Sequence, residues 1–296
     1  MVRPALRRVK SCDGFLRIGD SGRRPLNLSG RFEKNWPSPN RTTAMKFRLK
    51  AFGFHVLGSA TALALVLGVL YFGWYRWPGW YLTGALRVAL VMIGVDAVLG
   101  PLLTLIVANP LKPVRGLVRD IAIIVGVQVI ALLYGATTLW QGRPLYYAFS
   151  VDRLQIVQAS DLDSGEVALA RAQNPSFTPR WYSLPRWTWA PLPDDEKLRT
   201  EILSSAVFGG TDVVQMPRFF KAWESGLPEL RKQLKPVDRQ MLFSKSQKTT
   251  LKERMSRSGF APDQAITIFM TGRQSPVLAV FDPKTLQIRA ILSADS

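Results

Sequence analysis

Three long apolar runs dominate the first half of the chain. They cover about residues 51–75, 84–108 and 120–140, and the only charged residues in the middle run are Arg87 and Asp96. A helix rises 1.5 Å per residue, so roughly 20 apolar residues cross a hydrocarbon core about 30 Å thick. Small residues recur at four-residue spacing in these runs, which lets helices approach closely. The pattern predicts three transmembrane helices, packed as a bundle within residues 45–140.

Shorter apolar runs follow from residue 141 to residue 296, and their period changes along the segment. Alternating β-branched and aromatic residues predict two strands that meet near Asp152 and Arg153, and three more strands in the tail after residue 264. Apolar residues at helical spacing predict three helices, within residues 193–210, 217–225 and 245–258. The order of these elements predicts a small α+β domain with an antiparallel sheet and helices on one of its faces.

Lys and Arg residues are distributed unevenly around the apolar runs. Thirteen of them precede Ala51, three lie between the second and third runs (Lys112, Arg115 and Arg119), and Arg76 alone lies between the first and second. Basic flanks stay in the cytoplasm, so we expect a cytoplasmic N-terminus and a periplasmic domain after residue 140.

The first 44 residues are polar and show no helical or strand period. They predict a disordered cytoplasmic extension. Met45, followed by KFRLK, makes a good start for a membrane protein, and we expect it to be the natural start. The net charge of +18 belongs largely to this extension and to the basic flanks. No zinc-finger spacing, RNP motif or Arg-rich helix accompanies it, so we expect no nucleic-acid partner.

Residues for catalysis or metal binding are scarce. The chain has one histidine, His55, and one cysteine, Cys12, and both precede the C-terminal domain. A histidine-based metal site or a Ser-His-Asp triad therefore cannot form there within one chain. The carboxylates of "DLDSGE", residues 161–166, read as a solvated turn because the full calcium-loop pattern is missing. We assign no catalytic, cofactor or metal residue and expect a protein that is not an enzyme.

A polar notch interrupts the second run, in the stretch "GVDAVLGPLLTLIVANP". It combines Asp96, Gly100 and Pro101 with Gln128 from the third run. A carboxylate in mid-membrane is costly unless it is paired, so we expect a neutral or proton-sharing Asp96 that is hydrogen-bonded to Gln128. Thr61 is also within reach in depth. His55 is a poor partner because it is expected about 12 Å closer to the cytoplasm.

An aromatic segment, "RWYSLPRWTWAPLPDD", stands out in the C-terminal domain. Its three prolines rule out a regular helix, so we expect an aromatic loop. Trp181, Tyr182, Trp187 and Trp189 are candidates for two roles. They fill the core or lie at the level of the lipid headgroups, or they form an aromatic ledge that grips a partner protein.

Several blocks of the chain resemble one known family. "KAFGFHVLGS", "GVDAVLGPLLTLIVANP", "GRPLYYAFSVDRLQIVQASDL" and the late "TGRQSPVLAVFDPKT" are similar, in this order and spacing, to the TfpX/TfpZ family of type IV pilin accessory proteins. The resemblance implies a bacterial inner-membrane protein that helps a pilin subunit reach the pilus, and it brings no catalytic residues. We therefore expect a chaperone-like partner of the major pilin that also contacts membrane lipid. The alternatives are a membrane enzyme that modifies pilin, for example by glycosyl transfer, and a periplasmic ligand sensor.

Overall fold

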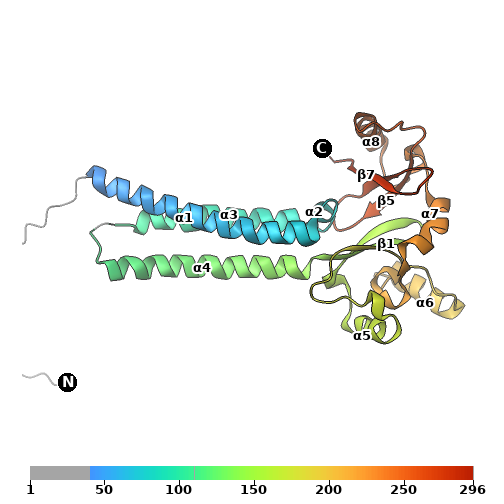
Figure 1. The fold of residues 1–296 in the computed structure, drawn as a ribbon, viewed down its shortest axis with the longest axis horizontal. Coiled ribbons are helices and arrows are strands. Elements are labelled where there is room, and N and C mark those ends of the chain that lie inside the picture. The colour runs from blue at the N-terminus through green and yellow to red at the C-terminus, as the bar shows by residue number, and fades with distance from the viewer. Residues whose placement is uncertain (1–40, 110, 296) are drawn as a thin grey trace, which may run out of the picture. The chain divides into compact units, whose positions relative to one another are not determined.

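The structure, a computed structural model, describes residues 41–109 and 111–295 (Figure 1). Most of the extension predicted over residues 1–44 lies outside the described residues. Its last four residues are helical, because the first helix, α1 (Arg41–Leu70), begins at Arg41.

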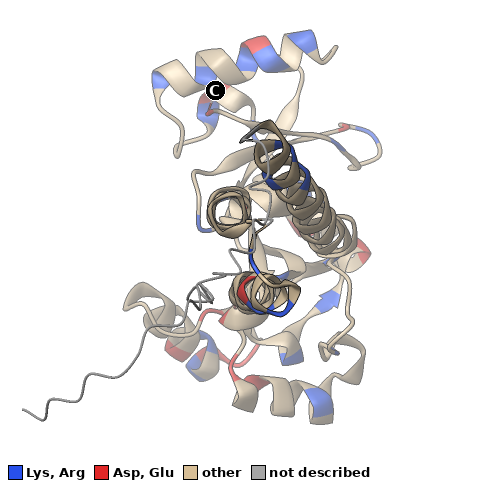
Figure 2. Cartoon of the chain, turned by 90° about the vertical axis from the view of Figure 1, so that its left-hand side faces the viewer, with Lys and Arg blue, Asp and Glu red and all other residues tan. Residues whose placement is uncertain are grey.

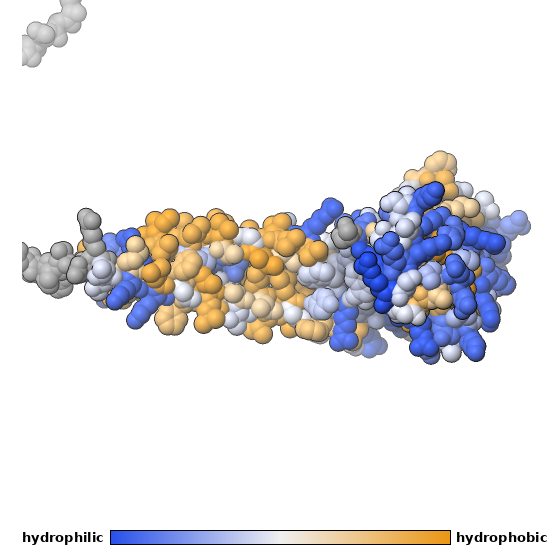
Figure 3. Space-filling model, turned by 90° about the horizontal axis from the view of Figure 1, so that it is seen from above, coloured by the Kyte–Doolittle hydropathy of each residue, from blue (hydrophilic) through white to orange (hydrophobic). Residues whose placement is uncertain are grey.

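Three long helices follow one another and are apolar enough to cross a membrane. The first span combines α1 with a turn of π-helix, η1 (Tyr71–Tyr75), and the others are α3 (Ala85–Val107) and α4 (Val114–Gln141). Helix α3 packs against both α1 and α4, whereas α1 and α4 make fewer contacts with each other. Most apolar side chains of the spans point outward and form a continuous hydrophobic band (Figure 3). That is the arrangement expected where lipid replaces water, and the predicted bundle of three long apolar helices is confirmed.

Basic side chains lie at the end of the bundle where α1 begins. Figure 2 faces this end and shows Lys and Arg on the nearest turns of α1 and α4. The turn between α3 and α4 lies at the same end, and there Lys112 Nζ lies 2.9 Å from an oxygen of Asp120. Because this ion pair is exposed, it contributes little to stability.

The C-terminal domain combines a seven-stranded sheet with four α-helices among the described residues. The strands are β1 (Pro144–Ser150), β2 (Arg153–Gln158), β3 (Arg186–Trp189), β4 (Lys221–Ala222), β5 (Ile266–Thr271), β6 (Val277–Phe281) and β7 (Ile288–Ser293). The helices are α5 (Ser164–Gln173), α6 (Glu196–Val207), α7 (Leu227–Gln233) and α8 (Lys245–Arg257). Short 3₁₀ turns connect them: η2 (Ala159–Asp161), η3 (Pro175–Phe177), η4 (Val213–Gln215), η5 (Pro217–Phe219), η6 (Trp223–Gly226) and η7 (Val237–Arg239). The predicted α+β class is confirmed.

The sheet differs from the expected antiparallel arrangement because it is mixed. Its order is β4-β3-β1-β2-β5-β6-β7. The hairpin β1–β2 and the meander β5–β6–β7 are antiparallel, as predicted. The central contacts β1–β3 and β2–β5 are parallel, because long connections bring β3 and β5 alongside the first hairpin. Such pairings join segments far apart in the chain, and local patterns do not specify them.

Apolar side chains are buried on both faces of the sheet, so the prediction of helices on one face is wrong. On β6, Val277 and Ala279 pack into a cluster with Leu230 of α7. Leu278, which points the other way, packs with Leu251 of α8. Since alternate residues of a strand face opposite sides, both faces of β6 are covered. The sequence carries this signal in the unbroken apolar run "VLAVF".

Two of the three predicted helices of the domain are confirmed, and their ends are encoded locally. Asp195 caps α6 by accepting a hydrogen bond from Leu198 N at 2.7 Å. Ser244 and Gln247 form a capping box at the start of α8, and Gly259 follows its end with a φ of 80°. Such ends require only neighbouring residues, so the sequence reveals them.

The third predicted helix, over residues 217–225, is wrong. This stretch forms η5, the short strand β4 and η6, and the helix α7 begins only at Leu227. Pairing of β4 with β3 places residues 221–222 in the sheet, which overrides the weak helical pattern. The sequence also missed α5, whose N-cap Asp163 lies in the stretch interpreted as a solvated turn.

A short helix between the first two spans, α2 (Gly79–Leu82), joins the bundle to the domain. Leu82 is fully buried in the same cluster as Phe149 and Ile268 of the sheet. Its carbonyl accepts a hydrogen bond from Arg273 N at 2.7 Å. Gly272 permits this approach, because a Cβ atom there would lie 2.6 Å from the Leu82 oxygen.

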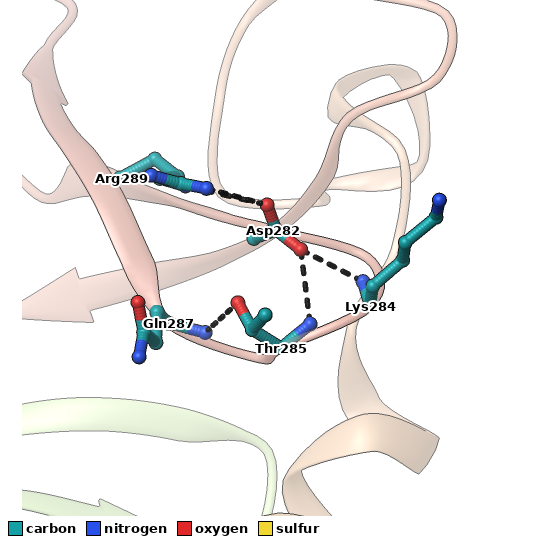
Figure 4. Close-up of polar contacts among 5 residues, drawn as sticks. All are labelled: Asp282, Lys284, Thr285, Gln287 and Arg289. Carbon is teal, nitrogen blue, oxygen red and sulfur yellow. Dashed lines mark hydrogen bonds and ion pairs between the residues drawn. The ribbon is translucent and has the colours of Figure 1, made fainter.

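The turn between β6 and β7 is organised by one carboxylate (Figure 4). One oxygen of Asp282 accepts hydrogen bonds from the backbone N–H groups of Lys284 and Thr285, each at 2.9 Å. The other oxygen accepts from Arg289 Nη2 at 2.9 Å. The backbone donors and then the Arg289 guanidinium hold the pKa of Asp282 well below its ordinary value, because all of them favour the charged form.

Candidate functional site: a polar cluster between the spans

A chain of hydrogen bonds links the three spans and runs from Asp96, at the middle of α3, to Thr104 near the end of the same helix. Gln128 Nε2 on α4 lies 3.0 Å from Asp96 Oδ1 on α3. Gln128 Oε1 lies 2.5 Å from His55 Nε2 on α1, and His55 Nδ1 lies 2.8 Å from Thr104 Oγ1, again on α3. We call these four residues the polar cluster. The contact between Asp96 and Gln128 is the one that the sequence predicted.

One neutral tautomer of His55 is compatible with every bond in the polar cluster. Gln128 must donate through Nε2 to the carboxylate, so its Oε1 is free to accept from His55 Nε2–H. The remaining nitrogen, Nδ1, then accepts from the hydroxyl of Thr104. The donors therefore run in one direction, from Thr104 to Asp96.

Position along each span explains why these side chains meet. Asp96 lies midway between Ala85 and Val107, and Gln128 lies close to the midpoint of α4. The first span runs from Thr42 to Tyr75, so its midpoint falls within four residues of His55. Polar groups in hydrocarbon satisfy one another because water is absent.

His55 is therefore a member of the site, which the sequence did not predict, although it reaches Asp96 only through Gln128 and forms no direct hydrogen bond with it. The sequence places the start of the first span at about residue 51, which shifts the expected centre toward its C-terminal half. The helix instead begins at Arg41. Thr61, which was expected to be within reach, donates to Leu57 O of its own helix.

Gly100 forms the wall against which Gln128 lies, and Pro101 follows it in the chain. Both are buried in α3 together with Thr104. A Cβ atom on Gly100 would lie 1.9 Å from Gln128 Nε2, so only glycine leaves room for the amide. Pro101 lacks an N–H and leaves the carbonyl of Ala97 without its usual helical donor. Helix α3 nevertheless continues to Val107.

Two apolar grooves open beside the polar cluster. The larger, of about 500 Å³, lies between α1 and α4 and has Asp96 and Thr104 of α3 on its wall. We call it the α1–α4 groove. Its lining is Ala51, Phe54, His55, Gly58, Ser59 and Ala62 of α1, and Ile121, Val125, Gln128, Val129 and Leu132 of α4. The smaller, of about 300 Å³, lies mainly between α3 and α4 and also reaches Asp96 and Gln128.

The aromatic segment of the C-terminal domain separates into two parts. Trp187 and Trp189 belong to β3 and pack against the main core cluster, where the Trp187 ring lies 4.8 Å from that of Tyr147. Trp181 and Tyr182 precede the strand and are exposed. The expectation of one continuous loop is therefore wrong, and only Trp181 and Tyr182 present an accessible aromatic surface.

The carboxylates of "DLDSGE" have separate structural contacts. Asp161 Oδ1 lies 3.0 Å from Arg273 Nη2, Asp163 caps α5, and Glu166 lies 3.2 Å from Arg218 Nε. Across residues 41–109 and 111–295, no group of three or more His, Cys, Asp or Glu side chains is arranged to hold a metal ion.

The fold and the polar cluster define a membrane-associated protein with three apolar spans and one α+β domain. Its sequence is similar to those of several fimbrial assembly proteins. The chain is 27% identical over 254 residues to the fimbrial assembly protein of serogroup I from Dichelobacter nodosus, a match that covers 84% of this chain and 96% of the relative. The serogroup E1 protein is also 27% identical, over 256 residues and the same shares of both chains.

A third relative is the fimbrial assembly protein of serogroups C1 and C2 from the same organism. It is 33% identical over 116 residues, which cover 39% of this chain and 88% of the relative. The chain belongs to the family of these fimbrial assembly proteins. No family model matches the sequence, and no solved structure matches it.

Proposed function

We propose that this protein is an inner-membrane accessory protein that assists the assembly or stability of a type IV pilin subunit, without catalysing a reaction. Membership of a family whose relatives are named fimbrial assembly proteins supports a role in pilus assembly. The resemblance to TfpX/TfpZ proteins supports the finer assignment to pilin. The basic end of the bundle supports a cytoplasmic N-terminus and a periplasmic C-terminal domain.

The α1–α4 groove is the observation that carries this proposal. Gly58, Ser59 and Ala62 on its α1 wall are small, so an incoming helix can approach the backbone closely. Asp96 lies on the groove wall with its Oδ2 atom free of hydrogen bonds to any described residue. The groove therefore offers an apolar helix both close packing and one polar contact. We assign it to the membrane helix of the pilin subunit.

Crosslinking from matched positions tests this assignment. A photoreactive residue replaces either Phe54, which lines the groove, or Leu57, one helical turn away and outside its lining. Val129 and Ile130 form a second pair on α4, with only Val129 in the lining. Phe54 and Leu57 have similar exposed fractions, 76% and 67%, whereas Val129 is 46% and Ile130 69% exposed, so greater crosslinking from Val129 would not follow from exposure. The tagged full-length chain is expressed in its own host and irradiated, and the crosslinked partners are identified by mass spectrometry.

We expect the major pilin to crosslink from Phe54 and Val129 and only weakly from Leu57 and Ile130. Equal crosslinking from both members of each pair would show that the pilin helix does not bind in the α1–α4 groove. Failure to recover pilin from any position, together with normal piliation in a deletion strain, would overturn the proposed function. A pilin mass that changes on deletion would instead favour an enzyme that modifies pilin.

A further inference from the structure

Three tryptophan side chains connect the ends of the spans to an exposed loop of the C-terminal domain. Trp74 ends the first span and Trp140 ends the third, and their rings lie 5.0 Å apart. Trp74 Nε1 donates to Ser183 O at 2.7 Å, and the Trp181 ring lies 6.4 Å from that of Trp140. Tryptophans at helix ends mark the headgroup region of a bilayer. Residues 179–184, which we call the interfacial loop, therefore lie at that level.

The interfacial loop carries large side chains that nothing in the described chain covers. Trp181 is 73% exposed and Leu184 is 59% exposed. Tyr182 is half exposed and lies edge-on to Trp181, with 5.4 Å between the ring centres. Apolar rings with a polar edge are stabilised where hydrocarbon meets headgroups, so this loop suits a lipid surface better than open water.

Two arginines supply positive charge beside these rings. Arg171 and Arg180 line one pocket of about 490 Å³ together with Pro175, Thr178, Pro179, Trp181 and Tyr182. Arg180 Nη1 donates to Tyr182 Oη at 2.8 Å, which orients its guanidinium. Neither arginine forms an ion pair with a described residue, and no carboxylate is among the residues that line the pocket. Guanidinium groups suit phosphate because they offer paired N–H donors in one plane.

We propose that Arg171 and the interfacial loop bind the phosphate of an anionic phospholipid headgroup and so hold the C-terminal domain against the membrane. Continuity with the tryptophans of the spans favours a lipid phosphate over a free one, because the site lies at headgroup level. This site requires only that the three helices span a bilayer. It is therefore independent of the pilin assignment.

The depth of the loop is tested on the full-length chain with Cys12→Ser, which removes its only cysteine. A nitroxide is attached to Leu184→Cys or, as a control, to Phe208→Cys. Phe208 is 88% exposed and is the C-cap of α6, a helix that lies on the side of the domain away from the spans (Figure 1). Both proteins are reconstituted in phosphatidylcholine vesicles containing phosphatidylglycerol. We expect oxygen to relax the label at position 184 more than a water-soluble nickel chelate does, and the reverse at position 208. Equal exposure of both labels to the chelate would overturn the proposal.

The headgroup is tested by lipid retention. Wild type and the double variant Arg171→Gln/Arg180→Gln are released from the same vesicles into detergent, and bound lipids are counted by native mass spectrometry. We expect the variant to retain roughly thirtyfold less phosphatidylglycerol, which corresponds to about 1 kcal/mol per arginine. Arg231→Gln/Arg257→Gln removes the same charge from other exposed positions and should retain lipid like wild type.

Inorganic phosphate separates a lipid site from a free-anion site. The retention measurement is repeated in millimolar phosphate, and we expect bound phosphatidylglycerol to persist. Displacement of the lipid by phosphate, or equal retention by the two double variants, would refute a headgroup site at this loop. Circular dichroism of each variant identifies loss of folding, and a misfolded variant is replaced by the corresponding lysine substitutions, which keep the charge but remove the planar pair of donors.

Discussion

Replacing Gly100 by alanine is expected to break the polar cluster at its centre. A Cβ atom there would lie 1.9 Å from Nε2 and 2.3 Å from Cδ of Gln128. The Gln128 amide ends a flexible side chain, so it can swing away, and the cost is the loss of its bonds to Asp96 and His55. Hydrogen bonds between membrane helices contribute about 0.6 kcal/mol on average and up to about 1.7 kcal/mol. For two such bonds, we expect a loss of about 1–3 kcal/mol in the free energy of unfolding.

Equilibrium unfolding of the full-length chain in mixed micelles measures this loss. Gly94 provides the control because it lies on the same helix and a Cβ atom there would meet nothing within 4 Å. Gly94→Ala should therefore leave stability unchanged or raise it slightly, since alanine favours helix more than glycine does.

A double-mutant cycle with Gln128→Ala tests the cause of the effect. Without the amide, Gly100→Ala has no side chain to displace, so it should cost little in the Gln128→Ala background. The coupling free energy between positions 100 and 128 should then account for most of the loss of about 1–3 kcal/mol expected for Gly100→Ala. An equal cost for Gly100→Ala in both backgrounds would refute the role assigned to Gln128.

Three further predictions concern the charge of the polar cluster, the β6–β7 turn and the join between bundle and domain. Asp96→Asn should leave pilus assembly nearly intact, because an amide oxygen still accepts from Gln128, and piliation counts in a complemented deletion strain measure this. Asp282→Asn should lower the thermal midpoint at neutral pH. Because the pKa of Asp282 is depressed in the folded protein, its charge stabilises the fold at pH values above the ordinary pKa of 3.8. This stabilisation is lost as the pH falls through the lower pKa of the folded state, so the difference in thermal midpoint between wild type and variant should disappear in acid. Gly272→Ala should destabilise the domain by about 1–3 kcal/mol, since the new Cβ atom meets the Leu82 carbonyl and backbone cannot swing aside, and hydrogen exchange at α2 should accelerate.

Each of these predictions has an outcome that contradicts it. A severe loss of pili with Asp96→Asn would show that assembly needs the carboxylate itself, since an amide keeps both the bond to Gln128 and a polar contact in the groove. A constant gap across pH for Asp282→Asn would mean that its charge does not act through the turn. Unchanged exchange at α2 in Gly272→Ala would mean that the Leu82 contact does not hold the domain to the bundle.

Local chemistry explains why much of the fold could be predicted. The length of the apolar runs is enough to predict the three spans, because a bilayer sets a minimum length for any helix that crosses it. Caps such as Asp195 and Ser244 define helix ends through neighbours three residues away. The β1–β2 hairpin and the final meander join strands that follow one another, so their pairing also needs little information from elsewhere.

Predictions failed where residues far apart in the chain decide the structure. The prolines around Trp187 and Trp189 predict a loop, but the pairing of β3 with β1 places both residues in the sheet. His55 joins the polar cluster through its bond to Gln128 of α4, which the apolar run around His55 does not predict. In each case a contact with another element decides where the side chain lies, and the local pattern does not contain that contact.

By itself, the sequence determined that three apolar helices precede an α+β domain, and that Asp96 and Gln128 lie at similar depth. Those properties depend on composition and on rise per residue. The tertiary structure alone decided that His55 and Thr104 complete the polar cluster, that a groove opens between α1 and α4, and that Leu82 enters the core of the domain. The reason is geometric, because these features depend on how helices are rotated and shifted against one another, which is set by packing across the whole bundle.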